Sequence, residues 1–391
     1  MRICHVITDL DPASGGPPVV ASRLAAAQAA AGHEVRLLCY AKPGDQERID
    51  AMLHGMPGGD ALIIEAQEPG GRVERTLTRR ANARLQALIE QLDVVHAHGV
   101  WDPILRASVM IARRAGVPGV VAPHGMLDEW ALSEKPLKKK LALTLAYNAM
   151  LKAASMFHAL SAYEQDCTRG FIRGLGAETP VEVIPNGVFL DEIDPLPEPG
   201  AFYAKHPELN GEPYVVFLSR LHPVKGLPIL VEAFASAIRD SAPARLVIAG
   251  PDAGAQGDAE QAARDHGVAD RVHFVGPQWG SDKYAALRDA RCFALPSEHE
   301  GFSMAICEAL ACGLPVAISD TCFFPDVATE GAGFVTPREA PPLAEALKTL
   351  LTDEPKARAK GEAGRRLVEQ RYTWPKIAER AVGLYEGLSG D

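Results

Sequence analysis

The feature that most constrains the fold of this chain is an alternation of apolar segments, glycine-containing loops and helix-like segments that occurs twice. Residues 2–8 are apolar and β-prone, and a glycine-rich loop, an alanine-rich helix at 19–31 and a second strand at 34–40 follow. The same order starts again with a strand at 214–219 and a helix at 227–237. Such repeats build parallel sheets with helices on both faces. The sequence therefore predicts an α/β protein with two Rossmann-like domains.

Length, charge and cysteine content narrow the class of protein. A chain of 391 residues is long for one core, which favours two domains. The net charge of −10 argues against general nucleic-acid binding. The seven cysteines are scattered and form no Cys-x-x-Cys pair, so we expect reduced thiols rather than disulfides or a zinc site. No signal peptide precedes the first strand and no apolar run reaches about 18 residues, so we predict a cytoplasmic protein.

The stretch 300–308 carries the strongest chemical signal. Glu300 stands in a loop after an apolar strand, and Glu308 lies within an apolar helix that starts near Ser303. Gly301 permits close approach of a backbone or a ligand, and Ser303 is a candidate helix cap. A helix start offers free N–H groups to a phosphate, and flanking carboxylates can accept hydrogen bonds from hydroxyls on either side. A nucleotide sugar has this layout, although both glutamates could instead be solvated surface charges.

Two cations in the second half suggest a site for an anion. Arg220 and Lys225 stand five residues apart in the loop after the strand at 214–219, and Gly226 follows at a helix start. An arginine provides a planar fork and a lysine a point charge, so together they can hold a diphosphate. The alternative is a pair of solvated charges.

In the first half, candidate ligand contacts lie where strands end. His124 follows the strand at 119–123, and His98 ends the buried strand at 93–98. Ligands of open α/β sheets bind at this edge, so we expect His124 to contact substrate, with His98 as the weaker candidate. Gly15 and Gly16 follow the first strand, where they could approach a phosphate. A structural histidine and a plain strand–helix turn are the alternatives.

We expect one helix at 72–91 and another at 134–154, and the second is basic and amphipathic. Four lysines, at 135, 138, 139 and 140, precede a run of leucines and methionine. Such a helix can lie on an anionic membrane surface, and we place this contact at 135–151 on the inner face of the membrane. The alternative is a core-facing helix with solvated lysines.

Taken together, these motifs resemble a known family. The retaining GT-B glycosyltransferases of family 4 carry two glutamates separated by seven residues, as Glu300 and Glu308 are. The other shared motifs, in family order, are Gly15-Gly16, His124-Gly125, Pro185-Asn186-Gly187, Arg220 with Lys225, and Tyr372-Thr373-Trp374. The resemblance covers almost the whole chain.

The resemblance implies an architecture and a reaction. It implies a GT-B fold, two Rossmann-like domains facing across a cleft, with an acceptor domain at 1–188 completed by a helix at 375–391 and a donor domain at 189–374. The reaction implied is transfer of a hexosyl unit from a UDP- or GDP-sugar, with retention, to a glycan or lipid-linked acceptor in polysaccharide biosynthesis. A nucleotide-sugar epimerase and a non-catalytic nucleotide-sugar or glycan-binding protein are the alternatives.

The resemblance also assigns roles to single residues. Arg220 and Lys225 would stabilise the leaving diphosphate, and His124 would orient the sugar or the acceptor. The remaining donor contacts expected are Glu300 with sugar hydroxyls, Glu308 with the ribose, and the backbone around Gly301, Phe302, Ser303, Gly15 and Gly16. No Asp-x-Asp motif stands where it would hold a metal on the diphosphate, so we expect no metal and no cofactor.

Overall fold

The computed structural model describes residues 1–11, 16–42, 44–133, 136–239 and 243–388. Two compact units divide the chain, and each is described by itself. Unit 1 comprises Met1–Asn186 and Trp374–Asp391, and unit 2 comprises Gly187–Thr373. Val188 pairs with Thr373 in a short parallel bridge, and both residues belong to unit 2.

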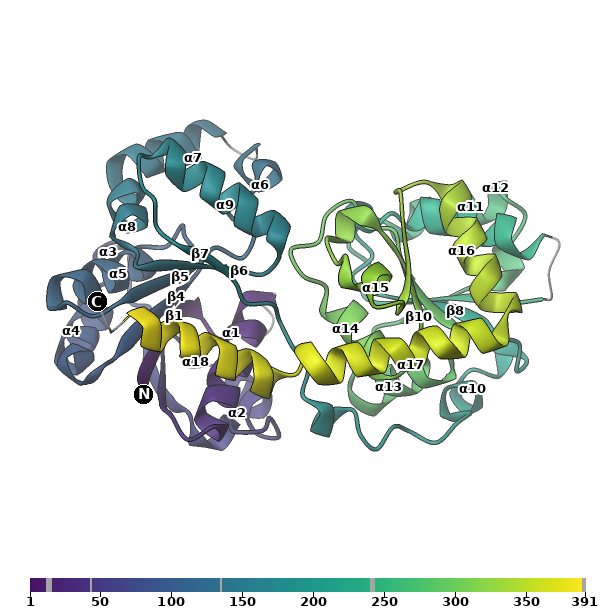
Figure 1. The fold of residues 1–391 in the computed structure, drawn as a ribbon, viewed down its shortest axis with the longest axis horizontal. Coiled ribbons are helices and arrows are strands. Elements are labelled where there is room, and N and C mark those ends of the chain that lie inside the picture. The colour runs from purple at the N-terminus through teal and green to yellow at the C-terminus, as the bar shows by residue number, and fades with distance from the viewer. Residues whose placement is uncertain (12–15, 43, 134–135, 240–242, 389–391) are drawn as a thin grey trace. The chain divides into compact units, whose positions relative to one another are not determined.

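Unit 1 is built on a seven-stranded parallel sheet with the order β3-β2-β1-β4-β5-β6-β7 (Figure 1). The strands are β1 Arg2–Asp9, β2 Glu34–Tyr40, β3 Ile63–Gln67, β4 Val94–His98, β5 Gly119–Ala122, β6 Met156–Ala159 and β7 Val181–Val183. The helices are α1 Gly16–Ala30, α2 Gln46–Leu53, α3 Arg72–Leu77, α4 Arg79–Leu88, α5 Pro103–Ala115, α6 Glu129–Ser133, α7 Pro136–Ala142, α8 Asn148–Ala153, α9 Ala162–Gly174 and α18 Trp374–Leu388. The chain order along the sheet reverses between β1 and β4, which makes this pair the topological switch point.

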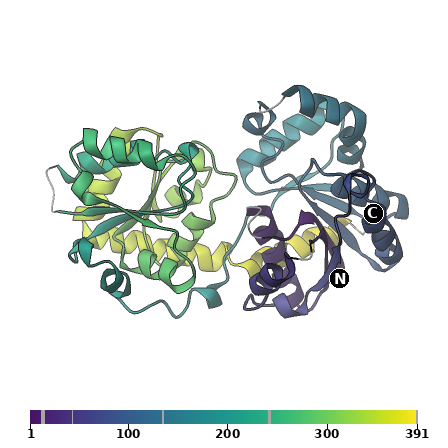
Figure 2. The same cartoon turned by 180° about the vertical axis from the view of Figure 1, so that it is seen from behind.

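The two faces of this sheet differ in chemistry because side chains alternate along a strand. Cys4 and Val6 of β1 join an apolar cluster with residues of α4, α5 and α8. His5 points to the opposite face, where α1 and α18 lie side by side, as the purple and yellow helices in Figures 1 and 2 show. The C-terminal helix therefore completes the layer over the polar face of the first sheet.

Unit 2 is built on a six-stranded parallel sheet with the order β10-β9-β8-β11-β12-β13. The strands are β8 Tyr214–Leu218, β9 Arg245–Ala249, β10 Val272–Gly276, β11 Cys292–Leu295, β12 Val316–Ser319 and β13 Gly333–Thr336. The helices are α10 Ala201–Lys205, α11 Leu227–Ile238, α12 Gln256–Asp265, α13 Gly280–Asp289, α14 Met304–Ala311, α15 Asp326–Thr329, α16 Ala340–Thr352 and α17 Glu354–Arg371. Here the switch point lies between β8 and β11, and one large apolar core surrounds the sheet.

Two helices expected from the sequence are interrupted. The expected helix at 72–91 ends at Leu77 and restarts at Arg79, because Thr78 adopts a left-handed conformation with φ of 50°. The carboxylate of Glu74 accepts a hydrogen bond from the N–H of Arg80, which supports the new helix start. The expected helix at 134–154 is α7, a π-helical turn at Leu143–Tyr147 and α8, with residues 134–135 outside the described part of the chain.

Candidate functional site

The loops that follow β8 and β11 are held together at the switch point of unit 2. Gly226 has φ of 71°, and a Cβ atom at this position would lie 2.2 Å from the carbonyl oxygen of Pro296. The N–H of Glu298 donates to the carbonyl of Val224 at 2.7 Å. Only glycine allows so close an approach, so Gly226 brings the lysine that precedes it next to the β11 loop.

Lys225 and Glu300 meet at this point as an ion pair. Nζ of Lys225 donates to Oε1 of Glu300 at 2.6 Å, and their side chains are only 14% and 9% exposed. The sequence predicted separate roles for the two residues and did not predict their contact. Each charge neutralises the other, which a buried pair requires.

Arg220 provides a second cation in the same loop. The residue is exposed, and within the described part of the chain its guanidinium forms neither an ion pair nor a hydrogen bond. A guanidinium fork with no carboxylate partner is available to an anion.

Glu308 has a partner that sequence reasoning missed. Its Oε1 accepts a hydrogen bond from Nζ of Lys283 in α13 at 2.7 Å, and the side chains are 15% and 18% exposed. A carboxylate within an apolar helix is expected to have a partner, because a buried charge without one is costly. Nothing in the sequence singled out Lys283, because it lies in another helix, 25 positions from Glu308.

The start of α14 keeps its amide groups available. Ser303 occupies the capping position but its side chain makes no cap hydrogen bond, so the expected Ser303 cap is wrong. Across the described residues, the N–H groups of Gly301, Phe302 and Ser303 donate to no protein acceptor. A Cβ atom at Gly301 would meet nothing within 4 Å, so no backbone approaches it. These N–H groups can therefore serve an anion at the helix N-terminus.

The side chain of Phe302 has a structural role. Its ring lies 5.2 Å from that of Phe324 and 5.8 Å from that of Tyr372, measured between ring centroids. The hydroxyl of Tyr372 donates to Asp326 at 2.7 Å. Phe302 and Tyr372, which the sequence singled out for separate reasons, thus belong to one aromatic cluster.

In unit 1, His124 occupies a constrained turn at the end of β5. Its φ of 52° is left-handed, as is that of Gly125 at 75°. Glu164, fully buried at the start of α9, accepts hydrogen bonds from the N–H groups of Gly125 and Leu160, each at 2.7 Å. The sequence did not indicate Glu164. This carboxylate fixes the turn that carries His124.

The imidazole of His124 belongs to a larger group of histidines. Its Nε2 lies 3.0 Å from Nδ1 of His98, which is nearly fully buried. Burial lowers the pKa of His124 to about 3, and burial also lowers the pKa of His98 well below its usual range. Both imidazoles are therefore neutral at physiological pH.

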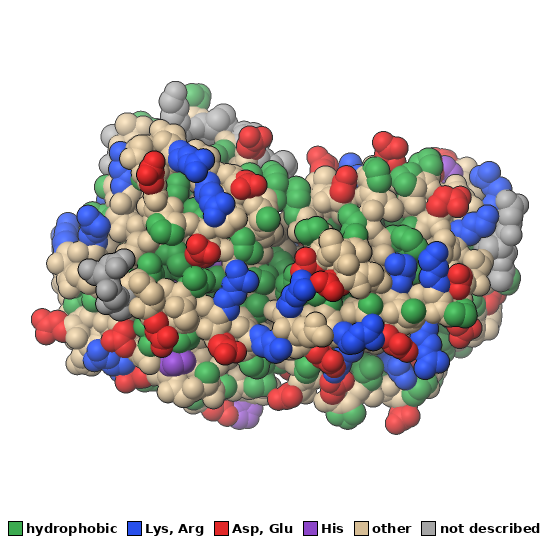
Figure 3. All heavy atoms as spheres, in the orientation of Figure 1, with side chains coloured by type: hydrophobic (Ala, Val, Ile, Leu, Met, Phe, Trp, Pro, Cys, Tyr) green, Lys and Arg blue, Asp and Glu red, His purple; other side chains and the backbone are tan. Residues whose placement is uncertain are grey.

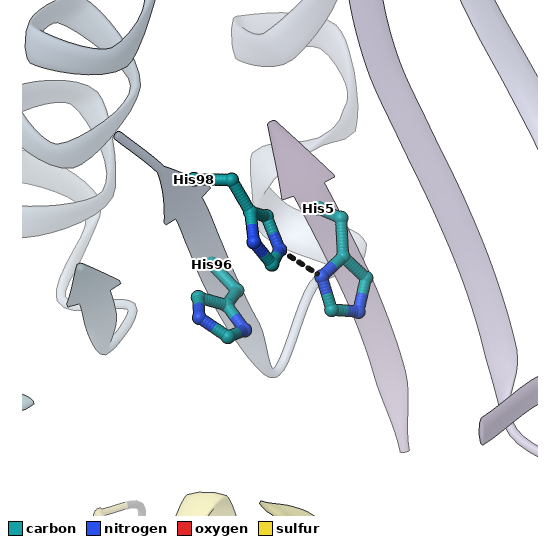
Figure 4. A group of neighbouring side chains, drawn as sticks. All are labelled: His5, His96 and His98. Atoms are coloured by element: carbon teal, nitrogen blue, oxygen red, sulfur yellow. Dashed lines mark hydrogen bonds between the residues drawn. The ribbon is translucent and has the colours of Figure 1, made fainter. Parts of the chain in front are cut away.

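Three buried imidazoles of unit 1 lie close enough to hold a metal ion. Ring nitrogens of His5, His96 and His98 come within 4.8 Å of one another, as Figure 4 shows. His5 and His98 already share a hydrogen bond of 2.8 Å, drawn as the dashed line. Two nitrogens bound to one zinc ion would lie about 3.3 Å apart, given Zn–N bonds of about 2.0–2.1 Å. The separation of 2.8 Å between the nitrogens of His5 and His98 is that of a hydrogen bond and not that of two ligands of one metal ion.

The glycine loop after β1 is described only in part. Gly15 lies outside the described residues, whereas Gly16 is exposed and begins α1. A Cβ atom at Gly16 would meet nothing within 4 Å, so the protein itself leaves this position open. Contact of this loop with a phosphate stays a prediction.

The charged side chains on the face drawn in Figure 3 are mixed in sign. Lysine and arginine side chains are interspersed with aspartate and glutamate over both units, and no broad patch of one sign covers this face. This face therefore produces no broad field that would attract ligands of one charge.

Comparison with known proteins identifies the class. The family model described as "Glycosyl transferases group 1" matches residues 201–367, and "Glycosyl transferase 4-like domain" matches residues 15–187. The crystal structure of Anabaena HepE in complex with UDP superposes with a TM-score of 0.75 at 19% identity, over 99% of this chain and 100% of that one. The fold is that of the GT-B glycosyltransferases.

Two curated relatives sharpen the family. A GDP-mannose-dependent alpha-(1-6)-phosphatidylinositol monomannoside mannosyltransferase of Mycobacterium tuberculosis is 28% identical over 349 residues, or 84% of this chain and 87% of the relative. The phosphatidyl-myo-inositol mannosyltransferase of Mycobacterium leprae is 27% identical over 394 residues, or 100% of this chain and 97% of the relative. The chain belongs to the group 1 glycosyltransferases of the family 4 type and is a nucleotide-sugar-dependent glycosyltransferase, which confirms the resemblance seen in the sequence.

Proposed function

We propose that this protein is a retaining hexosyltransferase that uses a GDP- or UDP-sugar, without a metal ion, to glycosylate a lipid-linked acceptor. The observation that carries the proposal is the ion pair of Lys225 with Glu300 at the β8/β11 switch point. The relative from Mycobacterium tuberculosis is a GDP-mannose-dependent mannosyltransferase that acts on a phosphatidylinositol monomannoside, so GDP-mannose is the first donor to test.

The ion pair supports an exchange of partners when the donor binds. A diphosphate that reaches Lys225 replaces Glu300 as the counter-charge, and the released carboxylate can accept hydrogen bonds from sugar hydroxyls. Lys225 keeps an anionic partner during this exchange and Glu300 gains hydrogen-bond donors, so neither buried ion is left without polar contacts. The lysine then stabilises the negative charge that develops on the leaving diphosphate.

Arg220 and the start of α14 complete the counter-charge. The unpaired guanidinium and the free N–H groups of residues 301–303 can bind diphosphate oxygens, which makes a divalent ion unnecessary. Glu308, held by Lys283, accepts hydrogen bonds from the ribose. In the retaining reaction the departing phosphate takes the proton of the acceptor hydroxyl.

Membrane contact is proposed through α7. Leu137 and Leu141, one helical turn apart on one face, are 84% and 60% exposed, and leucines so exposed on a helix are suited to insertion among lipids. Lys139 donates to the carbonyl of Ala131, whereas Lys135 and the side chains of Lys138 and Lys140 lie outside the described part of the chain. Among the described helices, none combines the length and apolarity needed to cross a bilayer.

The test begins with thermal stabilisation by a panel of nucleoside diphosphates and nucleotide sugars, with and without a chelator. A ligand that binds only the folded protein raises the unfolding midpoint. We expect a shift with guanosine or uridine diphosphates that the chelator does not change. Product formed with a lipid-linked acceptor should show the anomeric configuration of the donor by NMR. An inverted anomer, a chelator-sensitive shift, or epimerisation of the donor without an acceptor would contradict the proposal.

A further inference from the structure

A continuous set of hydrogen bonds crosses the polar face of the first sheet. It connects strands β1, β4 and β6 with helices α1 and α18 and ends at the turn after β5. The side chains of this set, called the histidine chain below, are His158, His96, Tyr385, Gln28, His5, His98 and His124. Because each ring nitrogen either donates or accepts, the position of one proton determines the next.

A backbone carbonyl fixes the first proton position of the histidine chain. Nε2 of His158 lies 2.6 Å from the carbonyl oxygen of Ile184, which can only accept, so this Nε2 carries a proton. Burial lowers the pKa of His158 to about 4 and keeps the ring neutral, which leaves its Nδ1 as an acceptor. Nε2 of His96, at 3.3 Å, donates to it. Nδ1 of His96 then accepts from the hydroxyl of Tyr385 at 2.8 Å.

Tyr385 sets the orientation of Gln28. Since its proton goes to His96, the Tyr385 oxygen accepts from Nε2 of Gln28 at 3.5 Å. Oε1 of Gln28 then accepts from Nε2 of His5 at 2.7 Å. Rotating the amide by half a turn would place its oxygen against another acceptor, so the opposite orientation is disfavoured.

From His5 the hydrogen bonds continue through His98 to His124, in the turn after β5. Nδ1 of His5 accepts from Nε2 of His98 at 2.8 Å, and Nδ1 of His98 accepts from Nε2 of His124 at 3.0 Å. The remaining nitrogen, Nδ1 of His124, keeps its lone pair, and no donor from the described part of the chain reaches it. His124 is also partly exposed, so this nitrogen is accessible to a ligand.

We propose that the histidine chain fixes His124 as the Nε2–H tautomer, so that Nδ1 accepts a hydrogen bond from a hydroxyl group of the substrate. Identification of that hydroxyl with the acceptor or the transferred sugar rests on the proposed function. The opposite tautomer would present an N–H group instead and could not accept. The positioning residues, which act through His124 without touching substrate, are His98, His5, Gln28 and Tyr385.

Neutrality defines what His124 does in the reaction. Burial lowers the pKa of His124 to about 3, so the ring does not take the proton of the substrate hydroxyl at neutral pH. The ring only orients this hydroxyl, through a hydrogen bond. The proton is left for the departing phosphate. A metal ion among His5, His96 and His98 would break this order, because all six of their ring nitrogens already form hydrogen bonds within the chain.

The first experiment is independent of activity. Long-range ¹H–¹⁵N NMR of protein labelled at histidine distinguishes protonated from unprotonated ring nitrogens. We expect all five histidines of the chain to be neutral Nε2–H tautomers at pH 7. An Nδ1–H tautomer at His124, His98 or His5 overturns the proposal, as does paramagnetic broadening of His5, His96 and His98 together by one equivalent of Co²⁺.

Tyr385→Phe tests whether the order is imposed from a distance. This variant removes the group that orients Gln28, so a mixture of both tautomers is expected at His5, His98 and His124. Tyr203→Phe is the matched control, because its hydroxyl donates to the carbonyl of Glu212 in unit 2. Unchanged tautomers in Tyr385→Phe would show that the chain does not set them and would refute the positioning role.

Kinetics connect the tautomer to transfer. His98→Leu removes the acceptor for His124 and should lower kcat by about tenfold, the value of one hydrogen bond, with less change in the KM for the donor. His98→Asn restores an acceptor near the same place and should recover most of that loss. Equal rates in the two folded variants would overturn the proposal. Failure of the proposed function would instead appear as absence of nucleotide binding and turnover in the wild-type protein, with the tautomers still as predicted.

Discussion

The two switch points of this protein satisfy their buried polar side chains with different chemistry. Between β1 and β4 of unit 1, polar side chains are neutral imidazoles joined by hydrogen bonds, with His5 directly opposite His96 in the sheet register. Between β8 and β11 of unit 2, the loops carry the ion pair of Lys225 with Glu300. Both arrangements satisfy buried polar groups, but only the second can exchange one charged partner for another.

Under the proposed function, this difference matches each unit to one kind of ligand. A neutral hydrogen-bond chain orders one terminal nitrogen and suits a hydroxyl group. An ion pair at a loop edge suits a doubly charged group such as a diphosphate, because the incoming anion would replace the carboxylate. We therefore propose that the protonation chemistry of the two switch points divides the binding of the donor diphosphate and of a substrate hydroxyl between the two repeats.

The largest expected difference between the two units is the loss of stability at low pH. Burial lowers the pKa of His5 and His158 to about 4, that of His124 to about 3, and those of His96 and His98 well below 6.5. Between pH 6.5 and about 4 the unfolded state therefore binds more protons, so stability falls as the pH falls, by about 1.4 kcal/mol per pH unit for each histidine.

Among the described residues of unit 2, burial lowers the pKa of His273. Hydrogen exchange measured from pH 7.5 to 5 should thus show the amides of β1 and β4 losing protection several times more steeply than those of β8 and β11. The unit 2 amides are the internal control. Equal slopes in the two sheets would show that the histidines are not neutral in the folded state.

Lys225→Ala should abolish most of the transfer reaction. Loss of the charge that stabilises the leaving diphosphate should lower kcat by about a hundredfold or more. Initial rates at saturating donor measure the effect, and Lys205→Ala, which removes a surface lysine paired with Asp282, is the control. Near-normal turnover in Lys225→Ala would remove the chemical basis of the comparison.

Replacing both exposed leucines of α7 by serine should weaken binding to membranes. Removing this apolar area from Leu137 and Leu141 should reduce partitioning onto anionic vesicles by about tenfold. Vesicle sedimentation measures the change. Val73→Ser, at an exposed apolar position on α3, controls for a general loss of surface hydrophobicity. Equal binding by wild type and the double variant would leave α7 as an ordinary solvated helix.

The smallest effect tests the exchange of partners in unit 2. Glu300→Gln leaves Lys225 without its counter-charge, so binding of free nucleoside diphosphate should tighten by about twofold to fivefold, within the range of a weak ion pair. Sugar transfer should be lost at the same time. Isothermal titration separates the two effects. Weaker nucleoside diphosphate binding would mean that Glu300, rather than Glu308, contacts the nucleotide.

The sequence alone predicted the class of fold and most of the charged residues of the candidate site. Apolar runs separated by glycine-containing loops and helical patterns located both sheets, because strands of a parallel sheet covered on both faces are apolar throughout. The spacing of Glu300 and Glu308, and of Arg220 and Lys225, predicted a donor site because the residues of each pair lie close together in sequence. The breaks at Thr78 and in the segment 134–154 were missed, since each depends on local backbone geometry that residue patterns do not specify.

Tertiary structure decided which of these groups touch. Lys225 meets Glu300 although 75 positions separate them, and Tyr385 reaches His96 across 289. His96 and His98 share a face because they are two residues apart on a strand. The family resemblance implied that a C-terminal helix completes the first domain, but not that Tyr385 of this helix bonds to His96. Ion pairs and tautomers are set by distances between groups remote in the chain, so only the folded arrangement of sheet and helices could specify them.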